Sequence, residues 1–326
     1  MDLRKEITEK ENMQLVIEGK TPAWLPSFFD ACAFVGHMKL GRVRLDNGNT
    51  KDIFGVEYTM TEDGPMPINT TTRNFELADI TKWRDIMPDI DLNSINWEEE
   101  AQTIKANQIK DGQMVNFSAG CVWEQLHYMM GFEGALLALL DNPEAAYDCM
   151  NAIADLLIDA MRRIYPYLQP ELIMFMEHVA TAKGLLMSLD TYRQVIKPVH
   201  KKMYDAIIDL GAIPEMHVDG YIEDIMDDYI ELGIKAIQPF QVFNDINYYK
   251  EKYGLLCIGG WDAIGRGNQA DSTEEEVRAS VRLAMDTYGP GSRYVFFPSG
   301  TTPRFAHVGG IVNDEALNYG LQFYKK

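Results

Sequence analysis

A histidine and an aspartate at the end of one predicted strand are the residues from which chemistry can most readily be built. The stretch from Ile213 to Gly220 reads IPEMHVDG. Its apolar part predicts a short strand ending at His217, and Asp219 follows in the turn before a helix-like segment. α/β enzymes concentrate their chemistry at the carboxyl ends of strands. The competing interpretation is that His217 bonds a neighbour and Asp219 caps the next helix.

Two other predicted strands also end in polar residues. LIMFM leads into Glu177 and His178, and LLCIGG leads into Trp261 and Asp262. A buried carboxylic acid can hold its proton near neutral pH, so these ends contain candidate proton donors. Ion-paired scaffold roles for Glu177 and Asp262, and a packing role for His178, are the alternatives.

The elements that must position these residues alternate between strands and helices. Eight short strands, most of them followed by a helical segment, predict an α/β protein: a single (β/α)8 barrel, with residues 1–20 as an N-terminal helical extension and 1–326 as one domain. The expected strands are 21–29, 53–59, 113–117, 172–176, 213–217, 235–240, 255–259 and 293–297.

Composition narrows the classes of partner. The net charge of −19 argues against nucleic acid and anionic membranes, because both require a positive surface. The charged N-terminus has no signal-peptide core and no run reaches membrane-spanning length, so we expect a cytoplasmic protein. Its four cysteines are scattered without a CxxC pair, which excludes a disulfide framework and a zinc finger.

The central part of the chain resembles the uroporphyrinogen decarboxylase superfamily. The resemblance rests on LIMFMEH, GLLMSLDTYRQVIKPVHKKM and HVDG, and continues through ELGIKAIQPF, CIGGWD and GPGSRYVFFPSG. It covers residues 110–310 well and the N-terminal third loosely. It implies a TIM barrel, but the function differs among the branches of the superfamily.

Two branches fit the residues poorly. The true decarboxylases hold a polyanionic porphyrinogen through an arginine-rich loop, whereas the matching segment here, PAWLPSFFDACAFVGH, contains no arginine. The thiol methyltransferases bind zinc through H-x-C and a later cysteine. Here Asp219 replaces the first cysteine, and Phe297-Pro298-Ser299 stands where the second would be.

The third branch, the substrate-activating methyltransferases of anaerobic O-demethylase systems, is the most similar. The shared segments are IFGVEYTMTEDGPMP, DITKWRDI, HVDG and IGGWD. The resemblance implies that the enzyme takes a methyl group from an aromatic methyl ether and transfers it to Co(I) of a corrinoid protein, in anaerobic one-carbon metabolism. The chain has no D-x-H-x-x-G corrinoid signature, so a partner protein must carry the cobalamin.

Cleavage of an aryl ether requires an acid, because phenoxide leaves more readily when its oxygen is protonated or polarised. We expect Glu177 or His217 to be the proton donor and Asp219 to orient His217 or the substrate oxygen. The expected substrate-binding residues are Tyr58, His178, Trp261 and Asp262. No metal ligand is assigned. A zinc site of Glu177, His217 and Asp219 stays open because histidine and carboxylates can bind zinc, although the usual cysteines are absent.

Several alternatives remain. They are a zinc-dependent thiol methyltransferase of the same fold, a non-catalytic barrel that binds a corrinoid protein, and a decarboxylase of a small acid, for which Arg266 lies close to Asp262 in the sequence. A homodimer is compatible with the sequence, which does not fix the oligomeric state.

Overall fold

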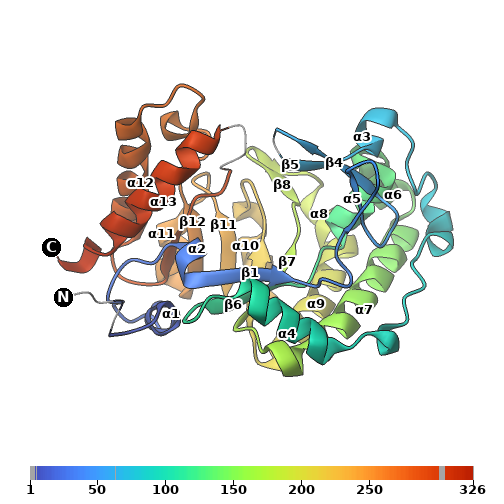
Figure 1. Cartoon of the computed structure of the whole chain (residues 1–326). Coiled ribbons are helices and arrows are strands. Elements are labelled where there is room, and N and C mark those ends of the chain that lie inside the picture. Colours follow the sequence, from blue (N-terminus) through green and yellow to red (C-terminus); the bar gives the residue numbers. More distant parts are fainter. Residues whose placement is uncertain (1–3, 5, 63, 301–304, 326) are drawn as a thin grey trace.

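Seven parallel strands form the curved central sheet in a computed structural model that describes residues 4, 6–62, 64–300 and 305–325 (Figure 1). Their order follows the chain: β1 (Cys32–Gly36), β6 (Met114–Ser118), β7 (Leu172–Met176), β10 (Ile213–His217), β11 (Ala236–Phe240), β12 (Leu256–Gly260) and β13 (Tyr294–Phe297). β11 and β12 are buried along their whole length, as expected of parallel strands covered on both faces. The α/β barrel-like fold is therefore confirmed.

The sheet closes toward a barrel through the segment before β1. Ser27 forms an isolated parallel bridge with Phe296 of β13, and the backbone N–H of Phe296 donates to the carbonyl of Pro26 at 3.0 Å. The short helix α2 (Phe28–Ala31) follows this bridge and leads directly into β1. The expected strand at 21–29 is thus reduced to one bridge, and the neighbouring barrel strand lies a few residues later.

The expected strand at 53–59 is not part of the barrel. Its second half belongs to β4 in an antiparallel sheet of order β2-β3-β4-β5. These strands are β2 (Val43–Arg44), β3 (Thr50–Lys51), β4 (Glu57–Thr61) and β5 (Gly64–Pro67). Periodicity predicts a strand but not its sheet, and here short turns pair β4 with its sequence neighbours.

Helices cover the barrel on the outside. Helices α12 and α13 pack together on one side, at the left in Figure 1, and α4, α7 and α9 lie on the other. The main helices are α1 (Glu9–Ile17), α4 (Trp97–Gln108), α5 (Trp123–Met130), α6 (Phe132–Asp141), α7 (Pro143–Leu168), α9 (Lys197–Leu210), α11 (Ile246–Tyr253), α12 (Glu274–Tyr288) and α13 (Ala306–Gly320). The shorter ones are α3 (Asn69–Thr72), α8 (Leu189–Thr191) and α10 (Met226–Glu231).

The N-terminal helix α1 begins and ends inside the segment expected to be helical. Thr8 caps it, and Glu11 completes a capping box. The first residues of that expected segment, 1–3 and 5, lie outside the described part of the chain. In the described part, no helix combines the length and apolarity needed to cross a membrane.

Candidate active site

The register of three neighbouring strands brings the candidate residues together. His217, the last residue of β10, is paired with Met176 of β7 on one side and with Gln238 of β11 on the other. Glu177 and His178 follow β7 directly, and the backbone N–H of Glu177 donates to the carbonyl of His217 at 2.8 Å. Polar side chains from separate parts of the sequence therefore meet at one edge of the sheet.

His178 lies between two carboxylates. Its Nδ1 is 2.7 Å from Glu124 Oε2, and its Nε2 is 2.8 Å from Asp219 Oδ2. Burial alone would lower the pKa of His178, but the neighbouring carboxylates of Asp219 and Glu124 outweigh it and raise this pKa to about 10. His178 is therefore an imidazolium at neutral pH when nothing else occupies the site.

His217 has the opposite character. Its Nδ1 lies 2.9 Å from the amide oxygen of Gln238, so the proton is on Nδ1 and the lone pair on Nε2. Burial, and the charge of His178 next, lower the pKa of His217. A neutral imidazole of this tautomer accepts a proton or binds a metal at Nε2, and the role of His217 as proton donor stays a prediction from the sequence.

Asp219 is held in place by the turn that follows β10. Gln241 Nε2 donates to Asp219 Oδ1 at 2.7 Å, and the Gly220 N–H donates to Gln241 Oε1 at 2.6 Å. Gly220 has a φ of +101°, and a Cβ there would lie 2.6 Å from the carbonyl oxygen of Thr181. Only glycine fits this turn, so the HVDG motif fixes the position of its aspartate.

The three side chains have the arrangement of a metal site. One ligand atom from each of His178, His217 and Asp219 lies within 4.8 Å of the other two. Each imidazole has its Nδ1 engaged outward, on Glu124 and Gln238, as ligating histidines usually do. His178 Nε2 is buried and has no hydrogen-bond partner among the described residues, because its approach to Asp219 lacks hydrogen-bond geometry. The donor set fits Zn²⁺.

Glu177 does not belong to this group. Its Oε1 and Oε2 accept the backbone N–H groups of Val122 and Trp123, at 2.5 and 3.0 Å, where α5 begins. The side chain is fully buried. Both oxygens thus accept hydrogen bonds at the N-terminus of a helix, which gives Glu177 an anchoring role. The zinc set that included Glu177 is replaced here by one with His178.

The other expected residues lie apart from the three ligands. Tyr58 is buried, donates to Asp52 Oδ2 at 2.9 Å and lines a separate cavity. The Trp261 indole is buried and donates to Ser280 of α12 at 3.0 Å. Asp262 lines one cavity beside α12 and, with Trp261, a small one that also reaches Gln241, the partner of Asp219. Arg266 is bound to Glu276 and Asp271, so it is not available to hold a substrate carboxylate.

Comparison with known families assigns the chain. The family model "Uroporphyrinogen decarboxylase (URO-D)" matches residues 50–304. The chain belongs to the URO-D family. This confirms the resemblance seen in the sequence and extends it across most of the N-terminal third.

The fold of this URO-D protein is also similar to that of a solved structure. A "methyltransferase from Methanosarcina mazei" matches with a TM-score of 0.67 and 13% identity, over 98% of this chain and all of the other. Methylaspartate ammonia lyase from Clostridium tetanomorphum (TM-score 0.34, 13% identity, 70% and 48% coverage) and YdhT from Bacillus subtilis (TM-score 0.43, 11% identity, 95% and 91%) match too weakly for argument. No curated protein sequence matches the chain.

Two residues of the site in this URO-D chain were not predicted from sequence. Glu124 lies on α5 and Gln238 on β11, and each orients one imidazole. Gln238 had a signal, since it sits in the predicted strand next to β10. Glu124 had none, because α5 reaches the site through tertiary contacts of its first turn with Glu177 and His178.

Proposed function

We propose that this protein is a methyltransferase that takes the methyl group of an aromatic methyl ether and passes it to Co(I) of a separate corrinoid protein. Family membership and the barrel shared with a methyltransferase over the full chain support the class of enzyme. The observation that carries the proposal is the convergence of His178, His217 and Asp219 at the strand ends, with both imidazoles oriented by outer partners.

The acceptor needs no nucleophile from the protein, because Co(I) is itself strongly nucleophilic. The chain must instead assist the leaving phenoxide. A Zn²⁺ held by His178, His217 and Asp219 would act as a Lewis acid on the ether oxygen and stabilise the developing negative charge. Glu124 orients the imidazole of His178 and Gln238 orients that of His217. Gln241 holds the carboxylate of Asp219 in place. Without metal, imidazolium His178 is the proton donor at the same place.

The first test is anaerobic and spectroscopic. The purified protein is mixed with cob(I)alamin, or a reduced corrinoid protein, and a panel of methoxylated aromatics. We expect the Co(I) band to convert to methyl-Co(III). Asp219→Asn should slow this conversion about 100-fold or more, which is the scale of a lost electrostatic group in a catalytic site. Asp224→Asn, an exposed carboxylate beyond the same turn, should leave it unchanged.

Metal analysis of the same preparations separates the two forms of assistance. Stoichiometric zinc that is lost in His217→Asn supports the Lewis acid. Activity that persists in zinc-free protein and disappears in His178→Asn supports the imidazolium. No conversion of Co(I) with any ether, under conditions where the protein is folded, would overturn the proposed reaction.

A further inference from the structure

A cavity opens at the ends of β1 and β6, against helix α5. Its volume is about 280 Å³, near the lower limit for small-molecule sites. The residues that matter in its lining are His37, Arg42, Tyr58, Gln125 and Tyr128. The cavity therefore joins the loop after β1, the antiparallel sheet and helix α5.

The described lining of this cavity contains one arginine, Arg42, which is exposed, and one carboxylate, Asp52. Its guanidinium carbon lies 3.5 Å from the centroid of the Tyr58 ring, the closest such stacking in the described residues. No hydrogen bond or ion pair joins Arg42 to another residue in the described ranges. Stacking on an aromatic face leaves the planar edge of the guanidinium, with its N–H donors, free for a planar anion.

Asp52, the nearby carboxylate, is already occupied. Its Oδ1 accepts the backbone N–H groups of Phe54 and Val56, and its Oδ2 accepts Tyr58 Oη and Gln125 Nε2. These four bonds lie between 2.9 and 3.1 Å. They fix the ring on which Arg42 stacks and leave Asp52 no free position for the guanidinium.

His37 is a second polar group on the cavity wall, with Glu100 as its nearest charged neighbour. Its side chain is 5% exposed, and neither ring nitrogen has a hydrogen-bond partner among the described residues. Its Nδ1 lies 3.7 Å from Glu100 Oε1, beyond hydrogen-bond range. Buried polar groups are normally hydrogen-bonded, and the long contact to Glu100 leaves this imidazole able to donate to a ligand.

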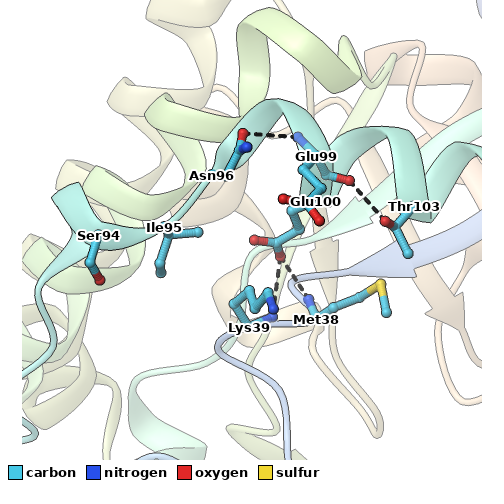
Figure 2. A pocket seen from close by; sticks show the side chains of 8 residues that line it. All are labelled: Met38, Lys39, Ser94, Ile95, Asn96, Glu99, Glu100 and Thr103. Atoms are coloured by element: carbon cyan, nitrogen blue, oxygen red, sulfur yellow. Dashed lines mark hydrogen bonds between the residues drawn. The ribbon is translucent and has the colours of Figure 1, made fainter.

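The loop that carries His37 is rigidly held. Figure 2 shows Glu100 of α4 above this loop, where one carboxylate oxygen accepts the backbone N–H groups of Met38 and Lys39 at 2.8 and 3.3 Å. Trp97 and Phe117 pack edge-on against the His37 ring. The positions of His37 and the start of the Arg42 loop are therefore set before any ligand arrives, which lowers the entropic cost of binding.

The cavity is connected to the three ligands through α5. Tyr128 lines the cavity, and its hydroxyl donates to Glu124 Oε1. The other oxygen of Glu124 contacts His178 Nδ1. Tyr128 and Glu124, one turn apart on α5, thus link the cavity wall to His178 through two side-chain contacts.

We propose that this cavity binds a carboxylate substituent of the aryl ether, with Arg42 as its counterion and His37 as a second donor. The inference rests on the proposed function and names its substrate class: methoxybenzoates, in preference to neutral methoxyarenes. On a protein of net charge −19, an anion needs such a local cation to overcome the overall repulsion.

Equilibrium calorimetry without any corrinoid tests this, using 4-methoxybenzoate and its neutral counterpart 4-methoxybenzyl alcohol. We expect the acid to bind more tightly, and less tightly as salt rises. Arg42→Leu should lower the affinity for the acid about tenfold or more. It should change the affinity for the alcohol less than about twofold, since only the charged hydrogen bonds are lost. The affinity of Arg42→Lys for the acid should lie between those of the wild type and Arg42→Leu, because lysine keeps the charge but lacks the paired N–H donors of the guanidinium. Arg44→Leu, an exposed arginine on β2, is the matched control.

Benzoate, which has no methyl group to donate, separates this inference from the proposed function. Arg42-dependent binding of benzoate together with a failed methyl-transfer assay would support the cavity and reject the reaction. Methyl transfer from neutral ethers, with equal affinity for the acid and the alcohol in the wild type, would overturn the carboxylate cavity and keep the reaction. Thermal unfolding of each variant confirms that it is folded.

Discussion

At the scale of single residues, the two histidines of the site differ because their outer partners differ. His178 faces two carboxylates and its pKa is raised to about 10, whereas His217 faces an amide and its pKa is lowered by burial. One ring type therefore supplies both a cation and a lone pair within one cluster, with ring centroids 5.2 Å apart. A bound metal would displace the proton of His178, because only the neutral ring is a ligand.

Glu124 is predicted to set the affinity of that metal without touching it. Glu124→Gln keeps the shape of the side chain but removes the charge that orients and polarises His178. We expect zinc affinity to fall by about 10- to 100-fold, the usual effect of losing an outer partner of a ligating histidine. Competition with a chelator measures this. Glu133→Gln on the exposed face of α6 is the control, and equal zinc affinity in both variants would contradict the assignment.

The sequence was most informative for residues that lie at the ends of barrel strands. His217 and Asp219 could be placed because a short apolar run, a turn and a glycine have local patterns. Glu124 could not, because its role depends on how α5 packs against β7. Arg42 could not be predicted for a related reason. It lies in the loop after β1, beyond the segment that corresponds to the arginine-rich loop of the decarboxylases, and only tertiary structure places it in a cavity.

At the scale of elements, helix α5 is the part that joins the barrel to both sites. It has eight residues, and no side chain caps its first turn from within the helix's own N-cap position. The carboxylate of Glu177 supplies that function from the end of β7. Since α5 also carries Glu124, Gln125 and Tyr128, the position of one buried carboxylate determines where three site residues stand.

Glu177→Gln therefore tests anchoring against acid catalysis. Loss of one acceptor and of the charge at the helix N-terminus should lower the free energy of unfolding by about 1–3 kcal/mol. Methyl transfer and zinc affinity should decline together, because α5 shifts. Chemical denaturation and chelator competition measure the two effects. A variant of unchanged stability that loses turnover alone would restore Glu177 as the proton donor expected from the sequence.

The strands predicted from sequence are correct where they are buried in the parallel sheet. They are wrong near the N-terminus, where the sheet closes toward a barrel. The six barrel strands β6, β7, β10, β11, β12 and β13 match their predicted segments to within one residue at each end, because buried parallel strands are largely apolar runs. The two N-terminal strands were misplaced. Ile53–Thr59 has strand composition, but short connections place it in an antiparallel sheet, and the first barrel strand is Cys32–Gly36 in place of the predicted 21–29.

At the scale of the whole molecule, one carboxyl inside the barrel couples stability to pH. Glu215 of β10 is fully buried and accepts Asn116 Nδ2 of β6 at 2.6 Å. Its other oxygen has no hydrogen-bond partner among the described residues. Burial raises the pKa of Glu215 to about 8, so the folded protein holds it neutral at pH 7.

The sign of the pH effect follows from this raised pKa. The unfolded chain releases the proton near pH 4.5 and the folded protein near pH 8, so the free energy of unfolding decreases as pH rises between these values. Glu215→Gln removes the dependence and keeps the bond to Asn116. We expect it to be more stable than the wild type by ~2–4 kcal/mol at pH 8, with little difference at pH 4.

Denaturant unfolding at several pH values measures the comparison. Glu144→Gln, an exposed carboxylate at the start of α7, should reproduce the wild-type curve. A constant difference between Glu215→Gln and the wild type from pH 4 to pH 8 would show that the buried carboxyl does not titrate in this range.

The single bridge between Ser27 and Phe296 has a consequence for how the protein is made. The ribosome releases the first partner early and the second only when most of the chain has emerged, so the sheet must wait with an open side throughout synthesis. During that time β1 can pair with β6, while the segment before α2 has no strand to meet. The last barrel strand therefore acts as the closing step of assembly, and a chain shortened before Tyr294 would present a permanently open sheet edge, which is a site for aggregation.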